Sequence, residues 1–207
     1  METNVAFATL SANEAACVTG VPLRQVHRMI DIGLLGTAVE KGRKSRTVLR
    51  DGLVCLRLAH ETTDILTLDG RRRLVRYLQE NPGAVTVRHG TLSVDVRSIK
   101  AEVRRGLSRL ARARRMMVED EEVLGGAACI RGTRIPAHDI ADMLANGDSV
   151  DAVRAAYPVL REEQIEAAGL YGRAYPRRGR PRREPFWRSG QPIASDEFDL
   201  AGPSSTR

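Results

Sequence analysis

The side chains that most often carry acid–base, nucleophilic or metal chemistry are few in this chain and far apart. The four histidines are at positions 27, 60, 89 and 138. His138 and Asp139 are neighbours, but successive residues of a helix point about 100° apart and do not face each other. The sequence has no pair of histidines at i and i+4 that could share a metal ion on a helix, and no serine in a G-x-S-x-G turn. We therefore predict that the chain is not an enzyme and that it holds no metal and no cofactor.

Cysteines and glycines lead to the same expectation. The three cysteines, at positions 17, 55 and 129, are odd in number and have no C-x-x-C spacing, which argues against a disulfide framework or a zinc module. The glycine-rich stretch before Thr133 lacks the lysine that a phosphate-binding P-loop requires. Arg131 and Arg134 in this stretch are instead expected to cap backbone carbonyls and hold the loop, with direct contact to a partner as the alternative.

Arginine is the residue type whose distribution suggests a function. The 207 residues carry 33 Lys and Arg against 26 Asp and Glu, a net charge of +7. Residues 1–70 are balanced, residues 71–115 have 13 basic and 3 acidic side chains, and residues 116–175 have 5 basic and 11 acidic ones. Guanidinium groups bind phosphate and carboxylate oxygens through paired hydrogen bonds. Such separate charge blocks predict modules with different partners, at least one of which is a polyanion.

A further basic block lies in the C-terminal tail, residues 176–207, which is rich in Pro, Gly, Ser and charged residues. The tail has no apolar periodicity, so we expect it to be disordered in the isolated chain. It nevertheless holds the only tryptophan, Trp187, next to Phe186 and close to six arginines. Because aromatic residues and arginine dominate binding hot spots, we predict a partner-binding anchor, with a nucleic-acid-binding arm as the alternative. The residues of the predicted anchor are Arg177, Arg178, Arg180, Arg182, Arg183, Phe186, Trp187 and Arg188.

Two short helices near the N-terminus are expected to form a helix-turn-helix. Ser11 and Glu14 make a capping box for the first helix, and Gly20 supplies the tight turn after it. Pro22 suits the first position of the second helix, because the missing N–H is not needed there. The buried stripe predicted for the second helix is Leu23, Val26 and Ile30. The residues predicted to face DNA from this helix are Arg24, Gln25 and Arg28.

A β-hairpin is predicted directly after this helix pair. Its strands are expected at residues 39–40 and 47–49, and the tip between them is strongly basic. A basic hairpin beside a helix-turn-helix has the form of a wing, whose side chains would contact phosphates. The wing residues predicted to contact DNA are Arg43, Lys44 and Arg46.

These N-terminal motifs resemble a known family of DNA-binding domains. The motifs that carry the resemblance are Thr19-Gly20-Val21, Arg24 and Ile32-Gly33-Leu34-Leu35, and the family is the MerR-type winged helix. The resemblance implies that Arg24 contacts DNA and that Arg43 and Arg46 contact it from the wing. The chain departs from the family pattern at residues 27–29, where the family usually has an arginine followed by two aromatic residues. The alternative is a small helical domain whose arginines are merely solvated.

The basic middle block is predicted to contain two helices around a hairpin. The helices are expected at 71–80 and 98–117, and the strands at 84–87 and 91–96. The residues predicted to face inward from the second helix are Ile99, Val103, Leu107 and Leu110. Arginines cover the rest of that helix, so we expect it to contribute salt-sensitive, sequence-independent affinity for phosphates. An ordinary solvated surface helix is the alternative.

The acidic block is predicted to form a small helical unit. A strand is expected at 118–124, and three helices begin near Pro136, Ser149 and Arg161. Three short helices bury little apolar area, so we expect this unit to need a partner surface or a second copy of itself.

The order of motifs in this unit resembles a second family. The motifs are Gly125-Gly126, the string Ile-Arg-Gly-Thr-Arg-Ile-Pro at 130–136, Gly147 and Tyr157-Pro158-x-Leu160. They resemble the small helical domain of unknown function in a VapB-type class of type II antitoxins, over about residues 118–175. The resemblance implies a cognate toxin with a PIN-like ribonuclease fold and a complex that represses its own promoter. An arginine-bearing tail would then enter the acidic Mg²⁺ or Mn²⁺ groove of the nuclease and exclude metal and RNA.

Together the patterns predict a mainly α protein with short β-hairpins. We predict a winged helix-turn-helix domain at 1–70, a basic helix-hairpin-helix segment at 71–117, a small helical antitoxin or dimerisation domain at 118–175 and a basic tail at 176–207. The predicted function is that of an antitoxin and autorepressor, which binds promoter DNA as a homodimer and its toxin in a hetero-oligomeric complex. One alternative is a MerR-like transcription regulator without a toxin. Another is an RNA-binding accessory protein, which the scarcity of aromatic residues disfavours.

Hydropathy and the first residues suggest where the protein acts. No run of apolar residues approaches the ~18 to 20 that a membrane span needs. The first residues, Met1 and Glu2, do not begin a secretory signal, so a cytoplasmic location is expected.

Overall fold

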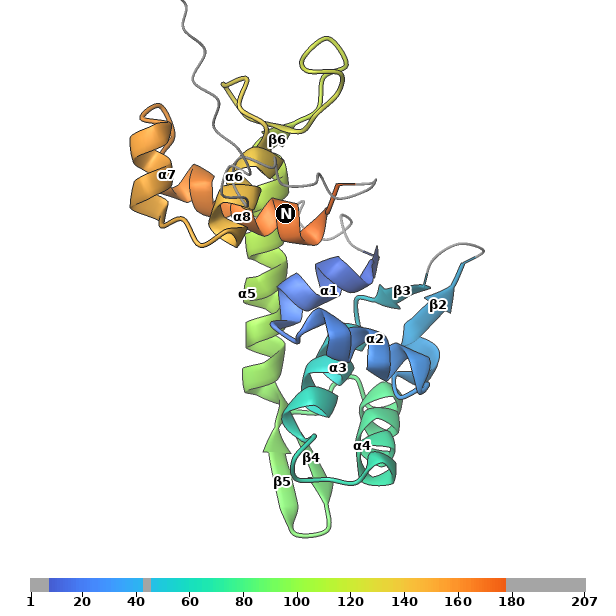
Figure 1. Ribbon diagram of the computed structural model, residues 1–207. Helices are drawn as coiled ribbons and strands as arrows, with labels where there is room; N and C mark the ends of the chain where they lie inside the picture. The colour runs from blue at the N-terminus through green and yellow to red at the C-terminus, as the bar shows by residue number, and fades with distance from the viewer. Residues whose placement is uncertain (1–7, 43–45, 178–207) are drawn as a thin grey trace, which may run out of the picture. The chain divides into compact units, whose positions relative to one another are not determined.

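The computed structural model describes residues 8–42 and 46–177, which belong to one compact unit (Figure 1). The predicted contact residues Arg43 and Lys44, and the predicted anchor from Arg178 to Arg188, lie outside these described residues. The described part has eight α-helices and three small antiparallel sheets, so the prediction of a mainly helical protein with short hairpins is confirmed. Within the same residues, no helix is both long enough and apolar enough to cross a membrane.

The helix-turn-helix consists of α1 (Ala12–Thr19) and α2 (Leu23–Asp31). The predicted capping box is present, with the Glu14 N–H donating to Ser11 Oγ and the Ser11 N–H to Glu14. Gly20 ends α1 in the left-handed conformation, at φ 71°. Pro22 takes the N-cap position of α2 rather than the first helical position that we predicted.

The buried face of α2 differs from the predicted stripe. Val26 and Ile30 are buried as expected, but Leu23 is 39% exposed and Met29 is buried instead. The physical reason is that α2 packs on α1 and α3 through its middle and its end, which leaves its first turn projecting. The helix ends at Asp31 with Ile32 as its C-cap, and Gly33 follows with φ 67°.

The hairpin after α2 is part of a three-stranded sheet. A short 3₁₀ helix (Gly36–Ala38) leads into β2 (Val39–Lys41), which pairs with β3 (Arg46–Leu49) as predicted. The other edge of β3 pairs with β1 (Thr9–Leu10), which gives the order β1-β3-β2. The sequence did not predict β1, because two residues are too few to show an alternating pattern.

Helices α3 (Gly52–Glu61), α4 (Leu68–Glu80) and α5 (Val96–Arg115) complete the first half of the fold, with the hairpin β4 (Thr86–His89) and β5 (Leu92–Asp95) before α5. α4 begins three residues earlier than predicted, because Thr67 caps it by accepting the Gly70 N–H at 3.3 Å. All four apolar residues predicted to face inward from α5 are buried. They join the helix-turn-helix in one hydrophobic core.

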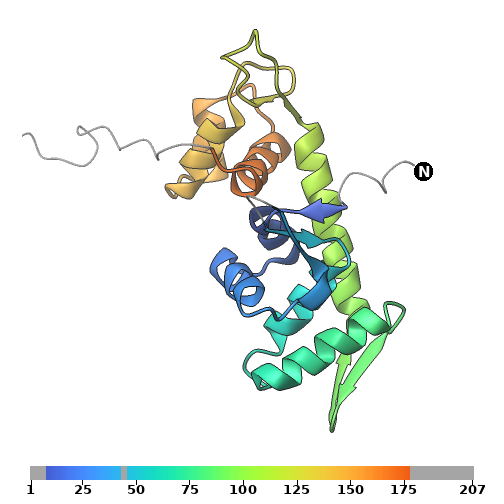
Figure 2. The ribbon, with the colours of Figure 1, turned by 90° about the vertical axis from the view of Figure 1, so that its right-hand side faces the viewer.

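The second half of the fold consists of β6 (Met117–Val118), β7 (Cys129–Ile130), α6 (Ala137–Ala145), α7 (Val150–Ala156) and α8 (Glu162–Ala174). The three helices lie where the sequence predicted them. The strand predicted at 118–124 is wrong beyond Val118, because residues 119–126 pair with no strand and 121–126 form turns. Figure 2 shows α5 running past both halves, and its contacts with α1 and α8 hold them together.

Candidate nucleic-acid interface

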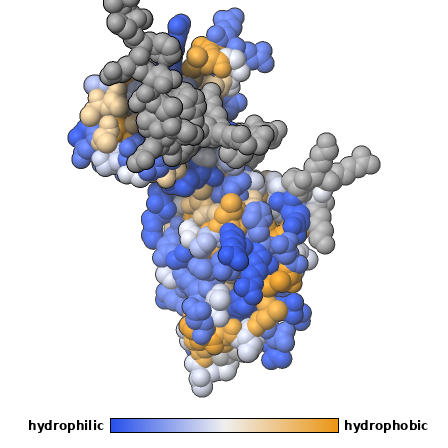
Figure 3. Space-filling model, viewed as in Figure 1, coloured by the Kyte–Doolittle hydropathy of each residue, from blue (hydrophilic) through white to orange (hydrophobic). Residues whose placement is uncertain are grey.

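The outer face of α2 gathers the polar residues that the sequence placed there. Arg24 and Arg28 are exposed and Gln25 is half-buried. Together with His27 and Asp31 they surround a shallow hollow on the helix surface. On the face shown in Figure 3, hydrophilic residues cover much of the surface over α2 and its neighbours, with smaller hydrophobic patches between them. The face can therefore offer several hydrogen-bond donors to base edges and phosphates without repacking the core.

Arg46 brings the wing to the same helix. Its Nη1 lies 2.6 Å from Asp31 Oδ1, and both side chains are about half exposed, at 45% and 55%. An exposed pair of this kind is worth roughly 0–1 kcal/mol, so a phosphate can replace the carboxylate at little cost. The pair also neutralises Asp31, whose free carboxylate would repel DNA from the end of α2.

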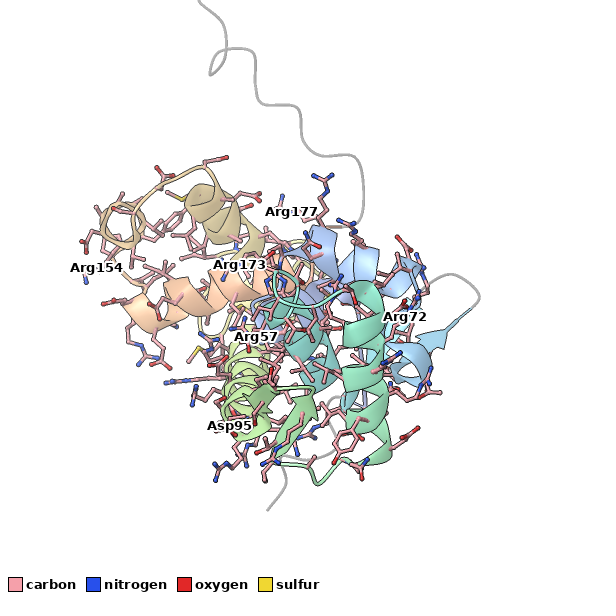
Figure 4. All side chains as sticks on the ribbon, turned by 90° about the horizontal axis from the view of Figure 1, so that it is seen from below. Arg57, Arg72, Asp95, Arg154, Arg173 and Arg177 are labelled. Carbon is pink, nitrogen blue, oxygen red and sulfur yellow. The ribbon has the colours of Figure 1, made fainter. Side chains whose placement is uncertain are left out.

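The turn that leads into α2 is fixed by Arg57, a residue of α3 that sequence reasoning missed (Figure 4). Its Nη1 donates to the Thr19 carbonyl at 3.0 Å, one of the carbonyls that the end of α1 leaves without a helical partner. The same guanidinium pairs with Glu61 at 2.8 Å and with Glu102 of α5 at 3.3 Å. The turn before α2 is therefore tied to two other helices.

The end of α2 is fixed from α4. Arg72 Nη2 donates to the Ile32 carbonyl at 3.4 Å, and Gln79 Nε2 donates to the Leu35 carbonyl at 2.7 Å. Figure 4 shows Arg72 on α4. No local pattern near Ile32 or Leu35 could have predicted these bonds, since their donors lie 40 and 44 residues further along the chain.

The outer face of α5 is a second basic surface. Arg104, Arg105 and Arg109 are exposed, and they line a groove with the turn residues Thr19 and Gly20. The predicted arrangement of this helix, apolar inside and basic outside, is confirmed.

The Arg-Gly-Thr-Arg loop holds itself together, as predicted for Arg131. Arg131 Nε donates to the Arg115 carbonyl at 3.0 Å, at the end of α5. Thr133 Oγ1 donates to the Ile130 carbonyl at 2.8 Å and accepts the Ile135 N–H at 3.1 Å. Arg134 is exposed. The Arg-Gly-Thr-Arg sequence therefore includes a threonine that shapes a turn and an arginine that caps the end of α5.

Arg177, the first residue of the predicted anchor, has intramolecular partners on α6. Its Nη2 pairs with Asp139 and lies 3.9 Å from Asp142 Oδ2. Next to it, His138 Nε2 is 2.7 Å from the Tyr175 carbonyl oxygen. The end of the described chain is thus fastened to α6, and the remaining anchor residues follow from that point.

The three cysteines have no disulfide partner. Burial and the nearby Asp51 carboxylate raise the pKa of the Cys55 thiol to about 12. Burial likewise raises the pKa of Cys17 and of Cys129. Thiols protonated in this way are weak nucleophiles and weak metal ligands. Within residues 8–42 and 46–177, no three His, Cys, Asp or Glu side chains are grouped so that they could hold a metal ion.

Comparison with known proteins gives two matches. Residues 117–171 match a family described as "Protein of unknown function (DUF433)", a segment that begins at β6 and ends in α8. Over 200 residues the chain is 32% identical to "Uncharacterized protein y4eO" of Sinorhizobium fredii (strain NBRC 101917 / NGR234), and the match covers 90% of each chain. No solved structure matches the chain.

Proposed function

We propose that this chain, which belongs to the same protein family as y4eO of Sinorhizobium fredii, is the antitoxin of a type II toxin–antitoxin system. It binds and inhibits a PIN-like ribonuclease toxin, and it binds promoter DNA as an autorepressor. It acts in the cytoplasm, as a homodimer and in a hetero-oligomeric complex with the toxin. It acts by binding to the toxin and to the promoter, and it catalyses no reaction.

The observation that carries the DNA-binding half is the position of Arg24, Gln25 and Arg28 on the outer face of a helix-turn-helix. A helix of this kind fits the major groove, which is about 12 Å wide. The wing residue Arg46 lies beside the same helix, through its pair with Asp31. Hydrogen bonds to backbone carbonyls hold the chain before and after α2. Their donors are Arg57, Arg72 and Gln79. The outer side chains of α2 are therefore held in one orientation.

The toxin-binding half rests on the composition of the tail, in which a Phe-Trp pair stands among arginines, and on the resemblance of residues 118–175 to an antitoxin domain. The residues that would contact the toxin run from Arg177 to Arg188, and Phe186 and Trp187 would fill apolar pockets beside the acidic metal site. Arginines entering that site would pair with the carboxylates that hold Mg²⁺ or Mn²⁺.

The test of the toxin half is co-expression with the product of the adjacent reading frame. We expect the full chain to rescue growth and a chain without residues 176–207 to fail. Phe186→Ala combined with Trp187→Ala should weaken inhibition of the purified toxin at least tenfold and change promoter affinity less than twofold. Unchanged inhibition by the double variant would rule out the anchor.

The test of the DNA half compares a duplex from the chain's own promoter with a scrambled duplex. Arg24→Ala combined with Arg28→Ala should abolish the preference between them. Arg97→Ala combined with Arg154→Ala is the matched control, because these exposed arginines pair with Asp95 and Asp151 away from α2. Wild-type protein that binds both duplexes equally would contradict the proposal.

A hollow between α3, α4 and α5 favours the second candidate, a MerR-like transcription regulator that responds to a small molecule. Its volume is about 540 Å³, within the range of small-molecule sites, and Val54, Leu78, Val103 and Leu107 are among its apolar lining residues. The hollow also reaches Leu49 at the end of the wing strand β3. An adjacent gene that encodes no nuclease would favour this candidate over the antitoxin.

A further inference from the structure

Four arginines from three elements converge on one hollow beside the end of α5. Arg112 and Arg115 come from α5, Arg131 follows β7, and Arg161 is the N-cap residue of α8. They line the hollow together with Gln164 and Met116. All four arginines are exposed, and their positions in the sequence did not predict that they meet.

The charge in this hollow is only partly compensated. Arg112 forms a salt bridge with Glu163 of α8. Arg131 uses its Nε to cap the Arg115 carbonyl, and its terminal nitrogens carry further N–H donors. Gln164 accepts the Arg161 N–H through Oε1 at 3.0 Å, so its amide nitrogen remains a donor. A concave group of four guanidinium groups, of which Arg112 alone has a salt bridge among the described residues, attracts an oxyanion, and planar guanidinium matches phosphate in particular.

The hollow lies at the end of a basic row on α5. At about 100° per residue, the side chains of this row occupy an arc of roughly 140° on the helix side opposite the core. The members of the row are Arg104, Arg105, Arg109, Arg112 and Arg115. From the first to the last the row rises ~16 Å, which matches the rise along the duplex axis of about five base pairs at ~3.4 Å each.

The row begins beside the helix-turn-helix and ends at the hollow. Its first part shares a groove with Thr19 and Gly20, the turn that leads into α2. Figures 1 and 2 both show α1 between α2 and α5, so the row is a surface separate from the outer face of α2.

We propose that the row and the hollow together, here called the α5 track, bind the phosphate backbone of a nucleic acid without reading its sequence. The inference rests on the proposed DNA-binding function, and it adds a second surface with its own ligand groups. The hollow holds one phosphate between Arg115, Arg161 and the Gln164 amide. The arginines of the row bind the neighbouring phosphates of the same strand, along α5 toward the turn before α2.

The experiment measures fluorescence anisotropy of the full chain with a labelled duplex of non-promoter sequence and with a single strand of equal length, over a range of salt concentrations. The variant is Arg115→Gln with Arg161→Gln, which keeps the backbone groups and the Arg131 cap. Its matched control is Arg97→Gln with Arg154→Gln, the same loss of charge at arginines outside the track.

On the duplex, the logarithm of the binding constant falls linearly with the logarithm of the salt concentration. Removing two phosphate contacts should make this slope less steep by about 1.8. We expect affinity near 0.1 M salt to fall more than tenfold for the variant and less than threefold for the control. A slope equal to that of the control, or no binding of wild-type protein to either nucleic acid, would overturn the α5 track. Tighter binding of the duplex or of the single strand identifies which form supplies the backbone. Should the double variant unfold, Arg161→Gln alone should lower the slope by about 0.9, and an unchanged slope there would count against the proposal equally.

Failure of this inference and failure of the proposed function are distinguishable. The α5 track is judged on non-promoter nucleic acid, whereas the proposed function is judged on preference for the promoter. Arg24→Ala with Arg28→Ala should remove that preference and preserve most of the sequence-independent affinity.

Discussion

The Arg57 guanidinium on α3 donates to the carbonyl of Thr19, the last residue of α1, across 38 residues of sequence. The carbonyl belongs to a helix end, where backbone acceptors lack helical donors, and a charged donor satisfies it. Because α2 begins four residues later, this bond helps set the direction in which α2 leaves the turn.

Replacing Arg57 should therefore weaken both the fold and DNA binding. We expect Arg57→Met to lower the free energy of unfolding by about 1–3 kcal/mol, because a charge-assisted bond is lost and a carbonyl is left unpaired. Urea denaturation measures the change. Arg97→Met, at an exposed arginine paired only locally with Asp95, should stay within about 0.5 kcal/mol of wild type. Equal effects of the two substitutions would contradict the role of Arg57.

Gly106 marks a close crossing of α1 and α5. A Cβ built on it would lie 2.0 Å from the Val18 carbonyl oxygen. Gly→Ala inside a helix normally stabilises by up to about 1 kcal/mol, but here we expect Gly106→Ala to destabilise by about 2 kcal/mol or more, because backbone must move. Thermal and urea unfolding test the sign. Gly83→Ala, where a Cβ meets open space, should be close to neutral, and a stabilising Gly106→Ala would contradict the close packing.

The pair between Asp31 and Arg46 should limit DNA affinity more than it adds stability. Asp31→Asn removes the carboxylate that Arg46 neutralises, so we expect promoter affinity to rise about two- to fivefold at low salt and the gain to shrink as salt screens the charges. Unfolding free energy should change by no more than about 1 kcal/mol. Asp151→Asn, which frees Arg154 away from α2, is the control and should leave affinity unchanged. Weaker binding by Asp31→Asn would show that the carboxylate serves the interface directly.

Tyr171 should make stability depend on alkaline pH. Burial, and then its hydrogen bond to Glu119 at 2.8 Å, raises the pKa of this hydroxyl to about 12 from an ordinary value of 10.0. The folded state therefore holds the proton more tightly than the unfolded chain, so this contribution is complete below pH ~10 and is lost as pH rises toward 12. We expect the unfolding free energy to fall between these values less steeply in Tyr171→Phe than in wild type. Tyr77→Phe, at an exposed tyrosine, should follow wild type, and identical slopes for all three proteins would refute the prediction.

Small residues in α8 illustrate what helix propensity misses. Gly169 and Gly172 weaken a helix when judged locally, yet a Cβ at Gly172 would lie 2.3 Å from the Ala141 Cβ of α6. Their absent side chains allow α6 and α8 to pack closely. Propensity describes an isolated helix, whereas this role exists only when a second helix is placed against it.

Features whose cause lies within one turn or one hairpin could be predicted from the sequence. The capping box at Ser11, the left-handed Gly20 and the helices after Pro136, Ser149 and Arg161 depend on neighbours three or four residues away. Periodicity likewise predicted the basic face of α5, because the inside and the outside of one helix are fixed by its own repeat.

Which distant groups meet depends on how the whole elements pack. Their packing paired Thr9–Leu10 with β3, turned Leu23 outward, placed Arg57 on the Thr19 carbonyl and collected Arg115, Arg131 and Arg161 around one hollow. The physical reason is that hydrogen bonds within a helix or a hairpin join residues a few positions apart, whereas the packing of whole elements sets the distance between residues far apart in sequence.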